Sequence, residues 1–116
     1  MWEEKVRIVT ASRLNREDFE ERSWLVRSLR GADIEMSVAY TNRRGLPEVY
    51  NEAIEAAAED NVLVFVHDDV WVVDRASLVT QICAGLDAFD VIGLAGNRRR
   101  LPGQCYGVAA GTKKNA

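Results

Sequence analysis

A histidine and two aspartates that end an apolar run are the residues of this sequence best suited to chemistry. Residues 62–66 are all apolar, and His67, Asp68 and Asp69 follow directly. Such a run is typical of a strand covered on both faces, as in the centre of a parallel sheet, and ligands of open α/β sheets bind beyond the carboxyl ends of the strands. If the chain stays extended past the run, side-chain alternation places His67 and Asp69 on one face and Asp68 on the other. The sequence therefore predicts a site at this strand end, with His67 and Asp69 as its natural pair.

The elements that must position this site follow from apolar periodicity. Strands are expected at 6–11, 34–40, 62–66 and 90–96, and helices at about 16–30, 47–60 and 77–88. Asn15 is a candidate N-cap of the first helix, Gly31 fits its end, and Pro47 fits the first position of the second helix. Because right-handed crossovers that contain a helix join parallel strands, the order β-α-β-α-β-α-β predicts an α/β fold with a Rossmann-like, mainly parallel sheet.

Size and composition limit the classes of protein that fit. The chain has 116 residues, of which 47% are hydrophobic, and this suits one domain with one core. A net charge of −3 argues against non-specific binding to nucleic acid or to an anionic membrane. No apolar run is long enough for a transmembrane segment and the start does not resemble a signal peptide, so we expect a cytoplasmic protein. Cys83 and Cys105 show no metal-ligand spacing and are expected to be free thiols.

Three segments carry a resemblance to a known family. Residues 10–16, 49–53 and 64–70 resemble the nucleotide-binding half of a GT-A glycosyltransferase related to glycosyltransferase family 2, and most of all the streptomycin-biosynthesis-type glycosyltransferase-like proteins. The likeness extends through 90–98. It implies a nucleotide-sugar-binding domain over 1–104, followed by a tail over 105–116 that we expect to be irregular. The second half of such an enzyme, with the acceptor site and the catalytic base, would follow the fourth strand, so we expect this chain to be a truncated relative that retains the donor-binding half.

The resemblance also implies roles for individual residues. His67, Asp68 and Asp69 occupy the place of the family's Asp-x-Asp motif, which holds a divalent metal on the diphosphate of the donor. Independently of any family, a hard cation that bridges a diphosphate and a carboxylate stabilises the leaving group. An imidazole in place of one carboxylate shifts the preference from Mg²⁺ toward Mn²⁺. The implied assignments are nucleotide binding by Thr10, Ala11, Ser12 and Asn42, metal binding by Asp69 and His67, and support from Asp68, Asn51 and Arg98.

Each of these residues also has a plainer interpretation. The 67–69 segment could be a solvated or capping strand end, and Asp68 alone fits a structural role better than a functional one. Asn51 fits helix packing at least as well as site formation. Runs of charge are usually solvated, so we assign at least two residues of 98–100, as well as Arg43 and Arg44, to solvated basic turns.

Three classes of function remain open at this point. The first is a glycosyltransferase-like domain that binds a nucleotide-diphospho-sugar through Mn²⁺ or Mg²⁺, with the acceptor unknown and activity of this chain alone in doubt. The second is a non-catalytic nucleotide- or partner-binding module that self-associates, for example as a homo-oligomer through an exposed sheet edge. The third is a receiver-like phosphoacceptor domain, but its acidic cluster should include the end of the first strand, where this chain has Thr10, Ala11 and Ser12.

Overall fold

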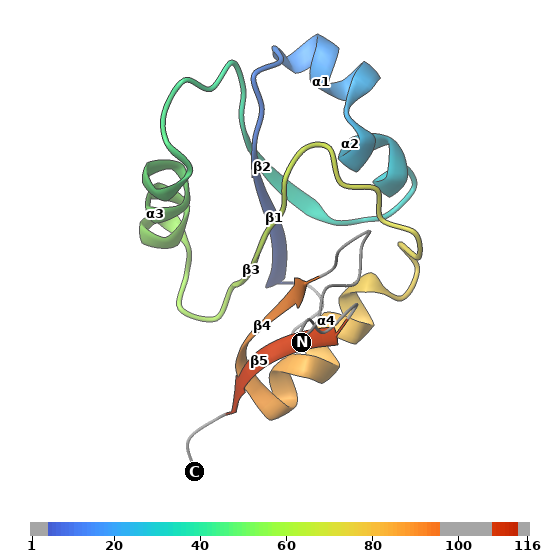
Figure 1. Ribbon diagram of the computed structural model, residues 1–116, viewed down its shortest axis with the longest axis vertical. Helices are drawn as coiled ribbons and strands as arrows, with labels where there is room; N and C mark the ends of the chain where they lie inside the picture. Colours follow the sequence, from blue (N-terminus) through green and yellow to red (C-terminus); the bar gives the residue numbers. More distant parts are fainter. Residues whose placement is uncertain (1–4, 96–107, 114–116) are drawn as a thin grey trace, which may run out of the picture. The chain divides into compact units, whose positions relative to one another are not determined.

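The computed structural model describes residues 5–95 and 108–113 of the chain (Figure 1). The chain divides into two compact units, Met1–Ser77 and Leu78–Ala116, and each is described by itself. The first unit holds a three-stranded parallel sheet with helices, and the second holds a helix and a two-stranded antiparallel sheet. The chain is therefore a mixed α/β protein. None of the helices in the described ranges is long and apolar enough to cross a membrane.

The parallel sheet of the first unit has the strand order β2-β1-β3. Its strands are β1 (Val6–Ala11), β2 (Glu35–Ala39) and β3 (Val62–Phe65). In the register, Ile8 of β1 lies between Met36 of β2 and Val64 of β3. Within this sheet β1 is the central strand and β3 an edge strand, although the apolar run of β3 predicts a central position. The charged Arg7 makes β1 look less like a central strand than the apolar β3. Arg7 fits the central strand because its guanidinium reaches the exposed Glu35 carboxylate of β2 at 2.8 Å.

The helix predicted over 16–30 is in fact two short helices, α1 (Arg16–Arg22) and α2 (Trp24–Leu29). Asn15 caps α1 as predicted, because its side chain accepts a hydrogen bond from the Asp18 N–H at 2.8 Å. The break lies at Ser23, whose extended backbone (φ −62°, ψ 125°) ends α1. The Ser23 hydroxyl then accepts a hydrogen bond from the Val26 N–H and caps α2. Ser23 therefore serves as the C-cap of one helix and the N-cap of the next, which apolar spacing alone does not reveal.

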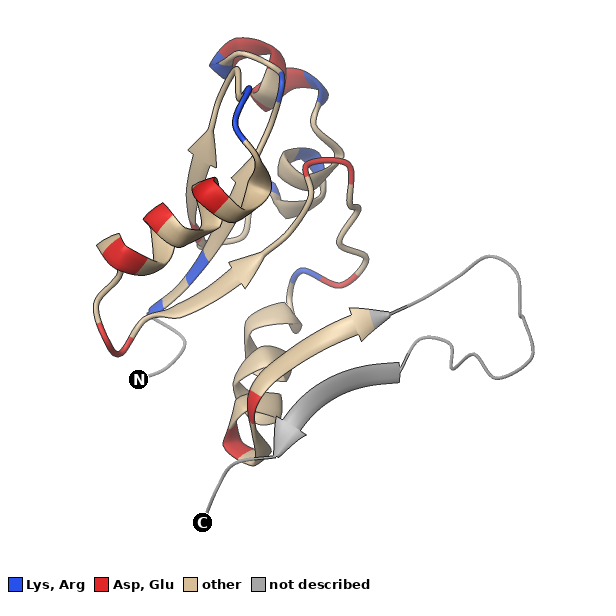
Figure 2. Cartoon of the chain, turned by 60° about the vertical axis from the view of Figure 1, so that its left-hand side comes forward, with Lys and Arg blue, Asp and Glu red and all other residues tan. Residues whose placement is uncertain are grey.

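Helices cover both faces of the parallel sheet. The pair α1 and α2 lies on one side and α3 (Leu46–Ala56) on the other, in both views (Figure 1 and Figure 2). On the α1 side, Phe19 and Leu25 are fully buried. On the α3 side, Val49 is buried and Tyr50 packs on Phe65 of β3 with ring centroids 4.4 Å apart. Opposite faces follow from the strand order, because the right-handed crossovers from β1 to β2 and from β2 to β3 run in opposite directions across the sheet.

The second unit contains α4 (Leu78–Ala88), β4 (Phe89–Ala95) and β5 (Val108–Lys113). The predicted fourth strand is present as β4, but its described partner is the antiparallel β5, with Ile92 opposite Gly111. The pattern β-α-β-α-β of a parallel sheet is thus established for the first unit only. The tail expected to be irregular over 105–116 contains β5, and the rest of that tail lies outside the described residues. Small residues such as Gly111 have low strand propensity, so pairing with β4, rather than local sequence, accounts for the strand.

Candidate functional site

An open cleft lies at the carboxyl ends of the three parallel strands. It has a volume of ≈ 950 Å³, at the upper end of the range of small-molecule sites. Three loops line it, one after each strand, and the lining residues are Ala11, Ser12, Arg13, Leu14, Thr41, Asn42, Arg43, Arg44, Leu46, His67 and Asp68. The chain leaves β1 toward β2 on one side and reaches β3 on the other, so the cleft is at a topological switch point. Ligands of open α/β sheets bind at this position.

Ser12 connects the three loops. Its side chain is buried, and its hydroxyl donates a hydrogen bond of 2.6 Å to the Asp68 carboxylate of the third loop. The same hydroxyl accepts a hydrogen bond from the Leu14 N–H at 3.2 Å. Its backbone N–H donates to Ala39 O at 3.0 Å, and its carbonyl accepts from the Asn42 N–H at 2.8 Å. The predicted site residue Ser12 therefore holds the cleft walls together as well as lining them.

The loop after β3 turns instead of staying extended. The Val70 N–H donates to His67 O at 3.4 Å, so the side chains do not alternate as they would in a continued strand. His67 and Asp68 consequently line the cleft together, and the exposed Asp69 is not among the lining residues. Asp68 is held through both its side chain and its backbone, because its carbonyl oxygen also accepts a hydrogen bond from the Ser23 hydroxyl at 2.8 Å. The extended continuation that pairs His67 with Asp69 does not occur, and the role of Asp69 as a metal ligand stays a prediction.

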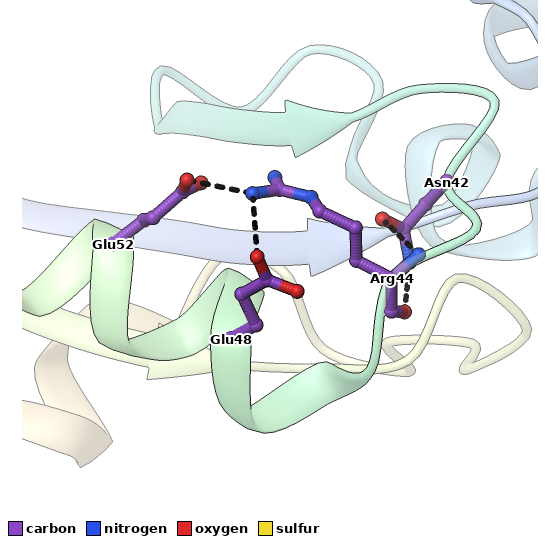
Figure 3. Close-up of polar contacts among 4 residues, drawn as sticks. All are labelled: Asn42, Arg44, Glu48 and Glu52. Carbon is purple, nitrogen blue, oxygen red and sulfur yellow. Dashed lines mark hydrogen bonds and ion pairs between the residues drawn. The ribbon is translucent and has the colours of Figure 1, made fainter.

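The loop after β2 has an unusual backbone. Thr41 has a φ of 48°, in the left-handed region that a β-branched residue rarely adopts. Two hydrogen bonds to the first loop hold it there, from the Thr41 N–H to Leu14 O at 2.9 Å and from the Asn42 N–H to Ser12 O. The Asn42 side chain is used within its own loop, where it donates to Arg44 O at 2.9 Å and accepts from the Arg44 N–H at 3.3 Å (Figure 3). Asn42 thus shapes the cleft wall that we predicted it to line.

Among the described residues that line the cleft, arginines outnumber carboxylates. Arg13, Arg43 and Arg44 line it, and Asp68 is its one lining carboxylate among the described residues. Arg44 is balanced by two acids of α3, Glu52 at 2.6 Å and Glu48 at 3.9 Å (Figure 3). The hydrogen bond from Arg44 lowers the pKa of Glu52 and raises the pKa of Arg44 itself.

From the sequence alone, Arg43 and Arg44 are expected in a solvated turn, and Arg13 is not a predicted site residue. A usable signal was present for all three arginines. Each follows the end of a predicted parallel strand by a few residues, and such strand ends meet at one edge of the sheet.

The remaining predicted site residues lie away from the cleft or outside the described ranges. Thr10 is completely buried in β1, where its hydroxyl has no hydrogen-bond partner in the described part of the chain, and it is not a lining residue. Asn51 is exposed on α3 and does not line the cleft either. Arg98 is not among the described residues. Ala11, Ser12, Asn42, His67 and Asp68 are therefore the predicted residues that the fold brings together.

The donor atoms fit a metal ion only if a ligand supplies most of its coordination. Within residues 5–95 and 108–113, no group of three or more His, Cys, Asp or Glu residues could hold a metal ion. His67 and Asp68 line the cleft, and Asp69 follows in the same turn. Mg²⁺ is commonly bound through one or two carboxylates together with phosphate oxygens of the substrate. These residues therefore fit an ion that arrives with a diphosphate.

Comparisons with known proteins add nothing to this geometry. No protein-family model, no curated protein and no solved structure matches the chain. The resemblance to glycosyltransferases therefore stays a prediction, and the case for a function rests on the cleft.

Proposed function

We propose that this chain binds a nucleotide-diphospho-sugar in the cleft, as the donor-binding domain of a glycosyltransferase-like protein. The observation that carries the proposal is a cleft at the switch point of a parallel sheet, where arginines outnumber carboxylates among the described lining residues. A diphosphate is the anionic ligand that such a cleft suits, and the volume leaves room for a nucleoside and a sugar.

The resemblance to GT-A glycosyltransferases supplies the roles within the cleft. Ala11, Ser12 and Asn42 would contact the nucleoside, and the 67–69 turn would lie near the diphosphate. A divalent metal, Mn²⁺ or Mg²⁺, would be held by His67 and Asp69 together with phosphate oxygens, and would neutralise charge on the leaving diphosphate. Asp68 supports the site by holding Ser12, since its carboxylate accepts the hydroxyl hydrogen bond at 2.6 Å. The proposal concerns donor binding, and we assign no catalytic base.

A thermal-shift titration against UDP-, GDP- and dTDP-sugars, with and without Mn²⁺, tests the proposal. A ligand at 100 times its Kd stabilises the folded chain by about 2.7 kcal/mol, which moves the melting temperature of a small domain by several degrees. We expect the Mn²⁺-dependent part of the shift to disappear in Asp69→Asn.

Asp33→Asn is the matched control, because Asp33 is an exposed aspartate of the same unit in the loop before β2. It should shift as the natural chain does. A cooperatively melting protein that no nucleotide sugar stabilises, with or without Mn²⁺, contradicts donor binding.

The alternative function is a non-catalytic binding module that self-associates, and the edge position of β3 favours it. In the described part of the chain β3 pairs with β1 alone, and Phe65 on it is 38% exposed. Unpaired strand edges are templates for pairing with another chain. Light scattering of the purified protein separates the two functions, since a stable dimer without nucleotide binding supports the alternative.

A further inference from the structure

We infer that Arg13 and Arg43 form an arginine clamp that binds the diphosphate of the ligand without a metal ion. The clamp rests on the proposed function, because it names the groups that hold one part of the same ligand. It differs from the metal-bridged arrangement, in which the charge of the diphosphate is neutralised by a cation at the 67–69 turn.

Backbone hydrogen bonds bring the two arginines to the same part of the cleft. Arg13 lies in the loop after β1, and Arg43 lies in the loop after β2. The Thr41 N–H donates to Leu14 O at 2.9 Å and the Asn42 N–H donates to Ser12 O at 2.8 Å. These bonds join residues one or two positions away from each arginine, so the clamp is built on two loops that are hydrogen-bonded to each other.

Neither member of the clamp has a counter-charge within residues 5–95 and 108–113. Of the nine arginines in the described ranges, six have an ion-pair, hydrogen-bond or aromatic partner, namely Arg7, Arg16, Arg27, Arg30, Arg44 and Arg75. The three without one are Arg13, Arg22 and Arg43, and two of these line the cleft. Two unpaired guanidinium groups in one cleft suit a phosphate-rich anion, because the planar fork of arginine donates two hydrogen bonds to phosphate oxygens.

Arg44 is excluded from the clamp although it follows Arg43 directly. Its guanidinium is bound to the Glu52 carboxylate and lies near Glu48, so the group carries one positive and two negative charges (Figure 3). An anion near Arg44 would meet net repulsion and would have to break an ion pair. Arg44 therefore neutralises the acids of α3 and is not available to bind the diphosphate.

The test is isothermal titration of the full chain with pyrophosphate and with UDP, in EDTA and then in Mn²⁺. We expect both ligands to bind in EDTA, and Arg13→Gln and Arg43→Gln each to weaken this binding about tenfold or more, as the loss of a charge-assisted hydrogen bond predicts. Arg22→Gln removes the same charge from an exposed residue of α1 that does not line the cleft, and its affinity should stay within about twofold of that of the natural chain. Affinity should also fall as NaCl is raised, because screening weakens the attraction of exposed charges. Circular dichroism melts of every variant establish that each one folds.

The outcomes separate the clamp from the proposed function. Binding of UDP that requires Mn²⁺ and is unchanged in both clamp variants overturns the clamp and leaves donor binding in place. Pyrophosphate binding that depends on Arg13 and Arg43, with UDP no tighter, supports the clamp and argues against recognition of uridine. A folded chain that binds neither pyrophosphate nor UDP in EDTA overturns the clamp, and the thermal-shift titration with all three nucleotide sugars then decides donor binding.

Discussion

Ser12 is the residue on which the geometry of the cleft depends most. It is 3% exposed, and its hydroxyl and backbone make hydrogen bonds to residues of all three loops. Its partner Asp68 is the carboxylate of the cleft, so loss of the hydroxyl leaves a partly buried charge without that hydrogen bond. Such a loss costs more than the loss of a bond between neutral groups.

We predict that Ser12→Ala lowers the free energy of unfolding by about 1.5–3 kcal/mol, the usual cost of removing a hydrogen bond to a charged group. Urea denaturation measures the change. Ser37→Ala is the matched control, because Ser37 lies half-buried in β2 with no hydrogen bond from its side chain in the described structure. It should change stability by no more than about 0.5 kcal/mol. An equal loss in both variants would show that the Ser12–Asp68 bond is not a significant contribution.

Close contact between α4 and β4 is the clearest packing constraint at the level of elements. A Cβ atom added at Gly85 of α4 would lie 3.0 Å from Ile92 Cδ1 and 3.4 Å from Ile92 Cγ2 of β4. Gly85 thus lets the strand approach the helix, at a cost in helix propensity of about 1 kcal/mol relative to alanine. An alanine at position 85 can regain this helix propensity only if the side chain of Ile92 makes room for the added Cβ atom.

We predict that the effect of Gly85→Ala on the free energy of unfolding is at least about 0.5 kcal/mol more stabilising in an Ile92→Val background than in the natural sequence. Valine lacks the Cδ1 atom, which is the atom nearest to the added Cβ position. A double-mutant cycle measured by urea denaturation gives this coupling. Ile82→Val, on the same helix, is the control background. It removes the same group, but both described atoms within 4 Å of the added Cβ position belong to Ile92. Equal effects of Gly85→Ala in all three backgrounds would contradict the close approach.

The response of the whole molecule to acid follows from three exposed carboxylates of the first unit. The pKa of Glu52 is lowered by its hydrogen bond from Arg44, that of Asp60 by Lys5 and that of Asp74 by Ser77. A carboxyl whose pKa is lower in the folded chain stabilises the fold fully above its ordinary pKa. That contribution is lost as the pH falls through the lowered value.

We predict that the free energy of unfolding is nearly constant above pH 5 and decreases below about pH 4.5, the ordinary pKa of a glutamate such as Glu52. Urea denaturation at pH 7, 5, 4 and 3 tests the window. Glu52→Gln should reduce the decrease, because it removes one of the three groups. Glu55→Gln, on the same helix and without an ion pair in the described structure, should leave it unchanged. A decrease that begins near neutral pH would contradict the assignment to carboxylates.

The sequence by itself determined the features that depend on neighbours along the chain. Apolar periodicity located the three parallel strands and most helical residues, and the spacing of Asn15 before an acidic turn identified the cap of α1. The position of the site could also be predicted, since the ends of β1, β2 and β3 must meet at one edge of a parallel sheet. These predictions succeed because strand period, helix period and capping are set over a few residues.

Only the tertiary structure decided which side chains meet in the cleft. The turn at 67–70 brings Asp68 rather than Asp69 beside His67, and this turn is tied by bonds to Ser12 and Ser23, far away in sequence. The pairing of Arg44 with Glu52 likewise depends on how α3 begins, and the neighbouring Arg43 has no counter-charge among the described residues. The strand order of the sheet, the presence of β5 and the break between α1 and α2 at Ser23 are also features that only the tertiary structure decided. Hydrogen bonds between distant segments set these features, and no pattern within one segment encodes them.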